Sequence, residues 1–231
     1  MRNIGVILAG GTGTRMGGAL PKQLLEVAGR PILAYSVRTF DSCPRISEIL
    51  LVMAPGYVPA AEELARPYPK VTKIIEGGAT RSESTVRALA ELAAEPDDGV
   101  VLFHDAARPF VDHDIIGRCL TALTSHDAVA VGMPVTDTIV HVGPDEQVTE
   151  MPPRADLRRF QTPQGFRLGT IRKAYELALA DPAFTATDDC GVVHRYLPDV
   201  AIPVVAGSEH NLKVTHPFDI TIAEALHGGL D

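Results

Sequence analysis

The chain has 231 residues with a formal net charge of −8, and it is 45% hydrophobic and 22% charged. These values are typical of one large folded domain, here expected over residues 1–231, and argue against wholesale disorder. The acidic balance argues against a nucleic-acid partner bound through a basic face, and no apolar run is long enough to span a membrane.

Short apolar runs alternate with amphipathic stretches along the chain. The expected elements are strand 4–9, helix 31–40, strand 49–53, helix 57–66, strand 71–75, helix 81–94, strand 99–104, helix 112–123, strand 128–131, helix 168–180, strand 201–205 and helix 217–226. This alternation predicts an α/β fold with a mostly parallel, Rossmann-like doubly wound sheet. Such sheets bind ligands beyond the carboxyl ends of their strands, which directs attention to the loops after Ala9, Ile75 and Phe103.

The segment 136–151 breaks this alternation. It has period-2 patterning on both sides of Gly143–Glu146, which predicts a protruding β-hairpin. A lone hairpin is only marginally stable in water, so it needs a surface to pack on. We expect a β-arm that contacts a second subunit, with Ile139, Val148 and Met151 as its apolar face.

Three cysteines lie far apart in the sequence: Cys43, Cys119 and Cys190. Their number is odd and their spacing matches neither a disulfide framework nor a zinc site. We therefore expect reduced thiols and a cytoplasmic location.

A glycine-rich stretch, Leu8–Gly18, directly follows the first expected strand. Glycines allow close backbone approach to a ligand, and their N–H groups can bind an anion. The stretch is not a dinucleotide fingerprint, because Met16 replaces the third glycine, and no Gly-Lys-Ser/Thr sequence makes it a Walker A loop. Two nearby cations, Arg15 and Lys22, suit a triphosphate. The alternative is a flexible turn with two solvated cations.

This stretch, together with Pro21-Lys22, resembles the opening of the nucleotidyltransferases that join a nucleoside monophosphate to a phosphorylated sugar or polyol. The resemblance implies a sheet of the nucleotidyltransferase type. It also implies that five residues lie at the triphosphate: Ala9, Gly10, Gly11, Arg15 and Lys22. It does not identify the base or the acceptor.

The segment Gly77–Ser84 lies at a strand-to-helix junction. Thr80 or Ser82 can cap the helix, and Glu83 fits as an acid in the first turn. Capping does not account for the pair of glycines at the start of the segment, which points to close approach of the backbone to the edge of a base.

The segment His104–Phe110 follows an expected buried strand. Asp105 stands at the carboxyl end of that strand, a common position for a Mg²⁺ ligand beside phosphates, and Arg108 is a planar cation suited to phosphate. The alternative is an ion pair between Asp105 and Arg108. His104 fits either the site or a hydrogen-bonded core position.

Further motifs follow at Gln161–Phe166, Thr187–Asp189 and Asn211–Thr215. Together with His-Asp-Ala-Ala-Arg-Pro they resemble the cytidylyltransferases that act on 2-C-methyl-D-erythritol 4-phosphate, over about residues 4–226. The ribitol 5-phosphate cytidylyltransferases share nearly all of these motifs. The Leu-Ala-Gly-Gly opening and Cys190 favour that sister branch, whereas His-Asp-Ala-Ala-Arg-Pro and Gln-Thr-Pro-Gln-Gly-Phe favour the erythritol branch. The acceptor therefore stays open at this point.

The resemblance implies roles for individual residues. Those implied at the nucleotide are Gly78, Ala79, Ser84 and Ala106. Those implied at the acceptor are Asp105, Arg108, Thr138, Arg154 and Thr162, with Asp105 also beside Mg²⁺. Lys213, which alone would be interpreted as a surface lysine, completes a catalytic phosphate cage with Arg15 and Lys22. Thr138 and Arg154 belong to or follow the arm and are expected to act across a homodimer.

The predicted reaction joins CMP from CTP to a polyol phosphate and releases pyrophosphate. The preferred candidate for the acceptor is 2-C-methyl-D-erythritol 4-phosphate, of the isoprenoid precursor pathway. The alternative is ribitol 5-phosphate or another polyol or sugar phosphate. A phosphomonoester is already largely ionised at neutral pH, so no general base is required. A third hypothesis is a regulator that binds nucleotide without catalysis. It predicts the loss of the phosphate cations, whereas Arg15, Lys22 and Lys213 are all present.

Overall fold

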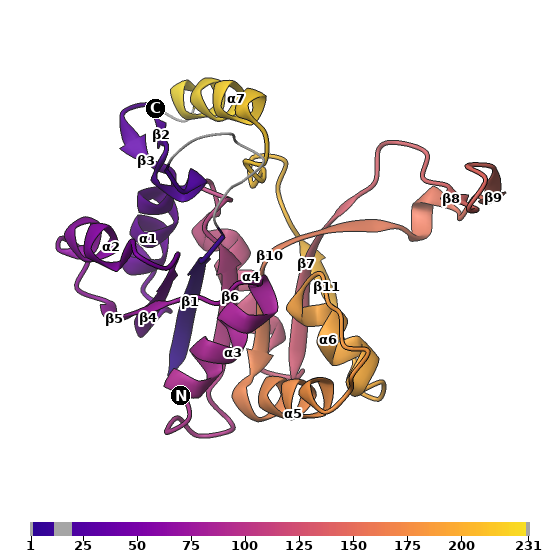
Figure 1. Ribbon diagram of the computed structural model, residues 1–231, viewed down its shortest axis with the longest axis horizontal. Coiled ribbons are helices and arrows are strands. Elements are labelled where there is room, and N and C mark those ends of the chain that lie inside the picture. Colours follow the sequence, from indigo (N-terminus) through magenta and orange to yellow (C-terminus); the bar gives the residue numbers. More distant parts are fainter. Residues whose placement is uncertain (1, 12–19, 230–231) are drawn as a thin grey trace.

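A seven-stranded sheet forms the centre of the computed structural model, which describes residues 2–11 and 20–229 (Figure 1). The sheet order is β11-β7-β10-β6-β1-β4-β5. Its strands are β1 (Asn3–Ala9), β4 (Glu48–Met53), β5 (Val71–Glu76), β6 (Val100–Asp105), β7 (Ala128–Pro134), β10 (Arg158–Arg167) and β11 (Val204–Ala206). Neighbouring strands are parallel except at β10, which runs antiparallel to β6 and β7. The prediction of a mostly parallel sheet is confirmed.

Helices cover both faces of this sheet. One face packs against α1 (Ile32–Ser42), α2 (Val58–Ala65) and α4 (His113–Ala122), and the other against α3 (Arg81–Glu91), α5 (Leu168–Leu179) and α6 (Asp189–Tyr196). Successive side chains of a strand point to opposite faces. In β1, Ile7 therefore joins the first core while Val6 and Leu8 join the second. This two-sided burial explains why the strand is apolar throughout.

The final helix, α7 (Pro217–Gly228), closes a smaller apolar cluster beside the sheet. Its Ala223 packs with residues of α1 and of the short ribbon formed by β2 (Glu26–Val27) and β3 (Arg30–Pro31). A turn of 3-10 helix over Lys22–Leu24 precedes that ribbon. Of the helices within the described residues, none combines the length and the apolar character needed to cross a bilayer.

Apart from the short β2–β3 ribbon and the turns of 3-10 helix, two elements of the described chain have no counterpart among the expected ones. The first is β10, where polar residues such as Gln161 and Gln164 are buried and therefore hide the apolar pattern of a strand. The second is α6, only eight residues long, whose start is fixed by the Asp188 side chain accepting from the Gly191 N–H at 2.7 Å. The helix expected over 81–94 ends earlier, at Glu91.

A long arm (residues 135–157) leaves the body between β7 and β10 (Figure 1). The hairpin expected over 136–151 is only partly right, because pairing is confined to β8 (His141–Val142) and β9 (Val148–Glu150), with a register shift between them. A turn of 3-10 helix over Arg154–Asp156 then leads into β10. Four large apolar side chains of the arm are exposed in this chain: Ile139, Val142, Val148 and Met151.

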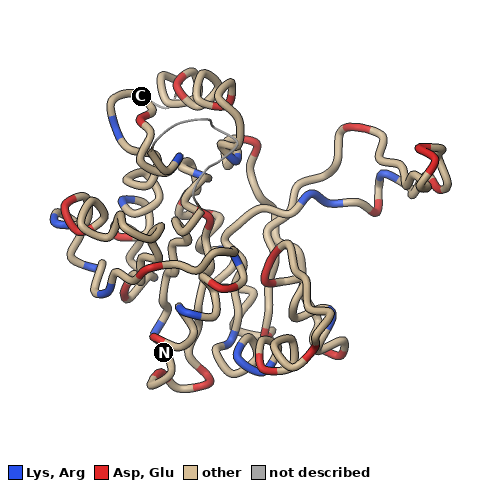
Figure 2. The backbone as a smooth tube through the Cα atoms, in the orientation of Figure 1, with Lys and Arg blue, Asp and Glu red and all other residues tan. Residues whose placement is uncertain are grey.

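Charge is distributed over the body without a dominant basic region. Figure 2 shows Lys and Arg interspersed with Asp and Glu along the described chain, and acidic positions near the tip of the arm. This distribution agrees with the net charge of −8. A strongly basic groove of the kind that binds a nucleic-acid backbone would require clustered cations.

Candidate active site

The carboxyl ends of β1 and β6 lie side by side and form the floor of a cavity. Leu8 is in register with Asp105, and the Ala106 N–H donates to the Leu8 carbonyl at 3.0 Å. After β1 the chain builds β4 and β5 on one side and then crosses to β6 on the other, so this is a topological switch point of the sheet. Open α/β sheets bind their ligands at such points.

The cavity has a volume of about 230 Å³ and brings together residues from distant parts of the chain. Most of the site residues expected from the sequence line it: Ala9, Gly10, Gly11, Lys22, Gly78, Ala79, Ser84, Asp105, Ala106 and Lys213. Arg15 lies outside the described residues. Thr138 and Arg154 are exposed on the arm, where Arg154 Nη1 donates to the Thr136 carbonyl at 2.9 Å.

Two lysines from opposite ends of the chain meet at this cavity. Lys22 Nζ donates to the Val214 carbonyl at 3.1 Å, which ties the start of the chain to the segment that carries Lys213. Lys213 Nζ lies 2.7 Å from Asp105 Oδ2, and its side chain is 41% exposed. Lys213 is therefore a partly exposed cation held at the cavity, rather than an isolated surface lysine.

Asp105 is the carboxylate of the cavity, and both of its oxygens contact cations. Oδ1 accepts from Arg81 Nε at 3.0 Å, while Oδ2 pairs with Lys213. Burial alone would raise the pKa of Asp105, but Arg81 and Lys213 together hold that pKa well below its usual range. The carboxylate is therefore ionised at any physiological pH. The alternative ion pair with Arg108 is wrong.

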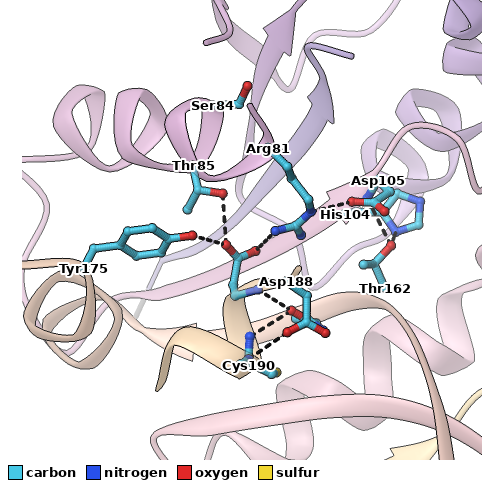
Figure 3. A network of polar contacts seen from close by, with 12 residues as sticks. Arg81, Ser84, Thr85, His104, Asp105, Thr162, Tyr175, Asp188 and Cys190 are labelled. Carbon is cyan, nitrogen blue, oxygen red and sulfur yellow. Dashed lines mark hydrogen bonds and ion pairs between the residues drawn. The ribbon is translucent and has the colours of Figure 1, made fainter. Parts of the chain in front are cut away.

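Arg81 is a cavity residue that the sequence interpretation did not assign. It is the first residue of α3, and its guanidinium reaches Asp105 with Nε and Asp189 Oδ2 with Nη1, the latter at 2.8 Å (Figure 3). Burial lowers the pKa of this guanidinium, but Asp189 and Asp105 raise it further than burial lowers it. The sequence contains an indication of these ion pairs, because Arg81 stands at the positive end of an expected helix, where a cation is unfavourable without carboxylates beside it.

Close packing within the protein explains the two glycines after β5, Gly77 and Gly78. A Cβ on Gly77 would lie 3.0 Å from the Gly10 Cα, and a Cβ on Gly78 would lie 2.2 Å from the Glu83 Cβ. Gly10 itself approaches Ser84, whose Oγ would be 2.7 Å from an added Cβ. The backbone segments after β1 and β5 therefore pack too closely for side chains. Close approach to a base is not needed to explain these glycines.

Ser84 and Thr80 fix the turn that precedes α3. Ser84 Oγ accepts from the Gly78 N–H at 3.1 Å and donates to the Thr80 carbonyl at 3.0 Å. Thr80 Oγ1 accepts from the Glu83 N–H at 3.1 Å, so Thr80 rather than Ser82 caps the helix. The Glu83 carboxylate accepts in turn from the Ala79 N–H at 2.8 Å.

Gln23 is a second residue that sequence reasoning missed. It is buried, and its Nε2 donates to the carbonyls of Ala9 and Gly11, the latter at 3.1 Å. A buried amide that satisfies two backbone carbonyls stabilises one conformation of the chain after β1. The only signal in the sequence is a polar residue directly after Lys22.

His104 is a hydrogen-bonded core residue, which is one of the two alternatives that the sequence left open. It is fully buried, with Nε2 3.0 Å from the Arg108 carbonyl and Nδ1 3.2 Å from Thr162 Oγ1. Burial lowers its pKa to about 4, so the ring is neutral at physiological pH. Thr162 Oγ1 also accepts from the Asp105 N–H at 3.0 Å, which places Thr162 behind Asp105.

Arg108 spans two loops beside the cavity. Its Nη1 donates to the Asn211 carbonyl at 2.7 Å and its Nη2 donates to the Phe160 carbonyl at 3.3 Å. These contacts join the start of β10 to the segment before Lys213. In the described chain, Arg108 therefore holds backbone groups together at the edge of the site.

Known proteins are similar to this chain in sequence over nearly its whole length. Residues 4–228 match the family described as IspD, 2-C-methyl-D-erythritol 4-phosphate cytidylyltransferase. A 2-C-methyl-D-erythritol 4-phosphate cytidylyltransferase from Thermobifida fusca (strain YX) is 50% identical over 226 residues, 95% of this chain and 91% of that protein. The bifunctional ribulose 5-phosphate reductase/CDP-ribitol pyrophosphorylase Bcs1 of Haemophilus influenzae is 40% identical over 97% of this chain, which spans about half (48%) of that protein.

Solved structures show the same architecture. The crystal structure of 4-diphosphocytidyl-2C-methyl-D-erythritol synthase from Anaerococcus prevotii DSM 20548 is similar with a TM-score of 0.88 and 29% identity, over 98% of this chain and 96% of that one. The 2-C-methyl-D-erythritol 4-phosphate cytidylyltransferase of Thermus thermophilus is similar with a TM-score of 0.76 and 33% identity, over 98% of each chain. The similarity thus extends over nearly the whole chain.

Proposed function

This chain belongs to the 2-C-methyl-D-erythritol 4-phosphate cytidylyltransferase family, and from that premise we propose that it joins CMP from CTP to 2-C-methyl-D-erythritol 4-phosphate and releases pyrophosphate. This is a reaction of isoprenoid precursor synthesis. The observation that carries the proposal is the meeting of Lys22, Lys213 and Asp105 with the glycines after β1 at one cavity. Fixed cations beside a glycine-rich backbone suit a nucleoside triphosphate.

The chemistry is a displacement at phosphorus. An oxygen of the acceptor phosphate forms a bond to the α-phosphorus of CTP, and the bond from that phosphorus to the bridging oxygen of pyrophosphate breaks. The acceptor oxygen is ionised at neutral pH, so the site needs no general base. Its task is to bring two polyanions together and to stabilise the charge of the transition state, and Lys22 and Lys213 are suited to both.

We propose that Mg²⁺ accompanies CTP. Among the described residues, no group of three or more His, Cys, Asp or Glu side chains could hold a metal ion alone. Mg²⁺ usually binds through one or two carboxylates together with substrate phosphates and water, and Asp105 in the cavity fits that role. When bound, the ion would neutralise phosphate charge, which adds to the effect of the lysines.

The acceptor is tested by measuring pyrophosphate release from CTP with each candidate. Ribitol 5-phosphate is the second candidate, favoured by the 40% identity to the protein named as a CDP-ribitol pyrophosphorylase. We expect kcat/KM to be highest with 2-C-methyl-D-erythritol 4-phosphate, as the 50% identity to a cytidylyltransferase of that name supports. A higher value with ribitol 5-phosphate would assign the chain to the second reaction, and no release with either would refute both.

We propose that the arm joins two subunits into a homodimer and that Thr138 and Arg154 act at the partner's acceptor site. The support is an arm with four exposed large apolar side chains and only a short stretch of strand pairing of its own. A two-stranded ribbon is marginal in water without cover. In the isolated chain both residues are exposed and neither lines the cavity.

Complementation tests this shared site. Lys22→Ala and Arg154→Ala are each expected to be inactive, but a mixed dimer would contain one site in which both residues are intact, so activity should partly return. The matched control mixes Lys22→Ala with Lys213→Ala, which belong to the same half of the site, so no intact site forms. No recovery from verified mixed dimers of the first pair, or an active monomer in sedimentation, would contradict the shared site.

We also propose that residues 1–231 work as one catalytic domain in the cytoplasm. The support for one domain is that β1 and β11, from opposite ends of the chain, belong to the same sheet. The support for the location is that Cys43, Cys119 and Cys190 are buried and free. Cell fractionation with antibody detection would test the location.

A further inference from the structure

A chain of alternating charges runs from the cavity into the core between α3, α5 and α6. It begins at Lys213, continues through Asp105 and Arg81, and ends at Asp189. Figure 3 shows the Arg81 guanidinium beside Asp105. Only its outer part lies at the substrate cavity. Asp189 is fully buried and does not line the cavity, so the proposed reaction gives it no direct role.

Asp189 is firmly anchored. Its Oδ1 accepts from the Tyr175 hydroxyl at 2.7 Å and from Thr85 Oγ1 at 3.0 Å, and its backbone N–H donates to Gln164 Oε1 at 3.1 Å. These partners come from α5, α3 and β10, three elements that are far apart in the sequence. A buried carboxylate with this many partners has a fixed position.

Arg81 connects the anchored Asp189 to Asp105 at the cavity. One side of its guanidinium pairs with Asp189 and the other with Asp105, and its side chain is 24% exposed. As the first residue of α3 it stands at the positive end of a helix, which is unfavourable for a cation. The position of Arg81 is explained by the two carboxylates that it joins.

The two cations on Asp105 differ in their freedom. Lys213 is 41% exposed and carries a flexible side chain, so it can turn toward a phosphate that enters the cavity. Arg81 is held by Asp189 and stays in place. If Arg81 were absent, Asp105 would have Lys213 as its remaining ionic partner and would compete with the substrate for it.

We propose that Arg81 is a positioning residue: anchored by Asp189, it holds Asp105 in place so that Lys213 is released to the substrate phosphates. This inference rests on the proposed cytidylyl transfer. It assigns no contact between Arg81 and substrate. Groups that orient a reacting shell in this way typically contribute roughly 10- to 100-fold to activity.

The first test is steady-state pyrophosphate release by Arg81→Gln, Arg81→Lys and the control Arg87→Gln. Arg87 is on the same helix, and its Nη1 donates to the Glu76 carbonyl at 3.3 Å, outside the cavity lining. We expect kcat of Arg81→Gln to fall roughly 10- to 100-fold, Arg81→Lys to recover part of that loss, and Arg87→Gln to match the wild type. A kcat of Arg81→Gln above about half the wild-type value would overturn the inference.

Loss of the buried partner could also unfold the chain, so a second variant separates stability from positioning. Arg81→Gln leaves Asp189 as an unpaired buried charge, which destabilises a fold strongly. The double variant Arg81→Gln/Asp189→Asn removes both charges and should regain a wild-type melting temperature while kcat stays low. Recovery of kcat together with the melting temperature would assign Arg81 a purely structural role and would overturn the inference.

A double-mutant cycle tests whether Arg81 acts through Asp105. If it does, Arg81→Gln should slow the Asp105→Asn enzyme by less than about 2-fold, because the group that it positions is already gone. Multiplication of the two single losses would overturn the inference. Failure of the proposed function is a different outcome: the wild type itself would then release no pyrophosphate with either acceptor.

Discussion

Replacing Lys213 by alanine should remove one cation from the cavity and leave the fold almost unchanged. The removed Nζ lies 2.7 Å from Asp105 Oδ2, where it can also reach an entering phosphate. Loss of one preorganised partner of transition-state charge typically lowers kcat roughly 10²- to 10³-fold, about 2.7 to 4 kcal/mol. The effect on the free energy of unfolding should stay below about 1 kcal/mol, because the lysine is 41% exposed and Asp105 keeps Arg81.

The assay is pyrophosphate release at saturating CTP and acceptor, with a melting curve of the same preparation. The matched control is Lys173→Ala on α5, which also removes an ion-paired lysine, 3.0 Å from Glu176, but outside the cavity lining. We expect the control to be fully active. A Lys213→Ala enzyme within about 3-fold of the wild type would refute the role of Lys213 in transition-state stabilisation, and a large fall in melting temperature would show that the ion pair with Asp105 mainly supports the fold.

Three further predictions concern the neighbouring groups. Lys22→Ala should lower kcat by at least about 100-fold with an unchanged melting temperature, and near wild-type turnover would remove Lys22 from the phosphate site. CTP should give a far higher kcat/KM than ATP or GTP, as membership of a cytidylyltransferase family implies, and comparable values would contradict a preference for CTP. Burial lowers the pKa of His104 from 6.5 to about 4, so between these pH values the unfolded chain binds a proton at His104 that the folded chain does not. The free energy of unfolding should therefore fall by up to about 3 kcal/mol as pH falls from about 6.5 to about 4. Urea unfolding across that range should show a slope that His104→Gln reduces, and an equal slope in both proteins would contradict the prediction.

Most of the fold was predictable because the central strands β1, β4 and β6 are buried on both faces. Continuous apolar runs such as Ile4–Ala9 between helical stretches indicate such strands directly. The pattern fails at β10, where Gln161 and Gln164 are buried and bonded to loop and helix-cap groups rather than exposed. Alternation of apolar and polar residues cannot reveal a polar side chain whose partners come from another part of the chain.

The candidate site was predictable to the extent that its residues belong to contiguous motifs. Lys22 and Asp105 follow strands that the sequence reveals, and both line the cavity. Arg81 and Gln23 were missed because their roles depend on pairs formed across the fold, with Asp189 and with the Ala9 carbonyl. Long-range partners of this kind leave little local signal. A charge placed against a helix dipole is the exception, since it already requires a partner of opposite charge.

The balance of charge explains why the proposed site for polyanions contains a carboxylate among its cations. Within the described residues, Lys22, Arg81 and Lys213 all line one small cavity and would repel one another in the absence of substrate. Asp105 neutralises part of that repulsion because it pairs with both Arg81 and Lys213. Because the cations already line the cavity, rotation of the Lys213 side chain is the main change needed when phosphate charge arrives, and such limited reorganisation favours electrostatic catalysis. Asp105 therefore weakens the net attraction of the cavity for substrate phosphates, but it also positions the cations that bind them.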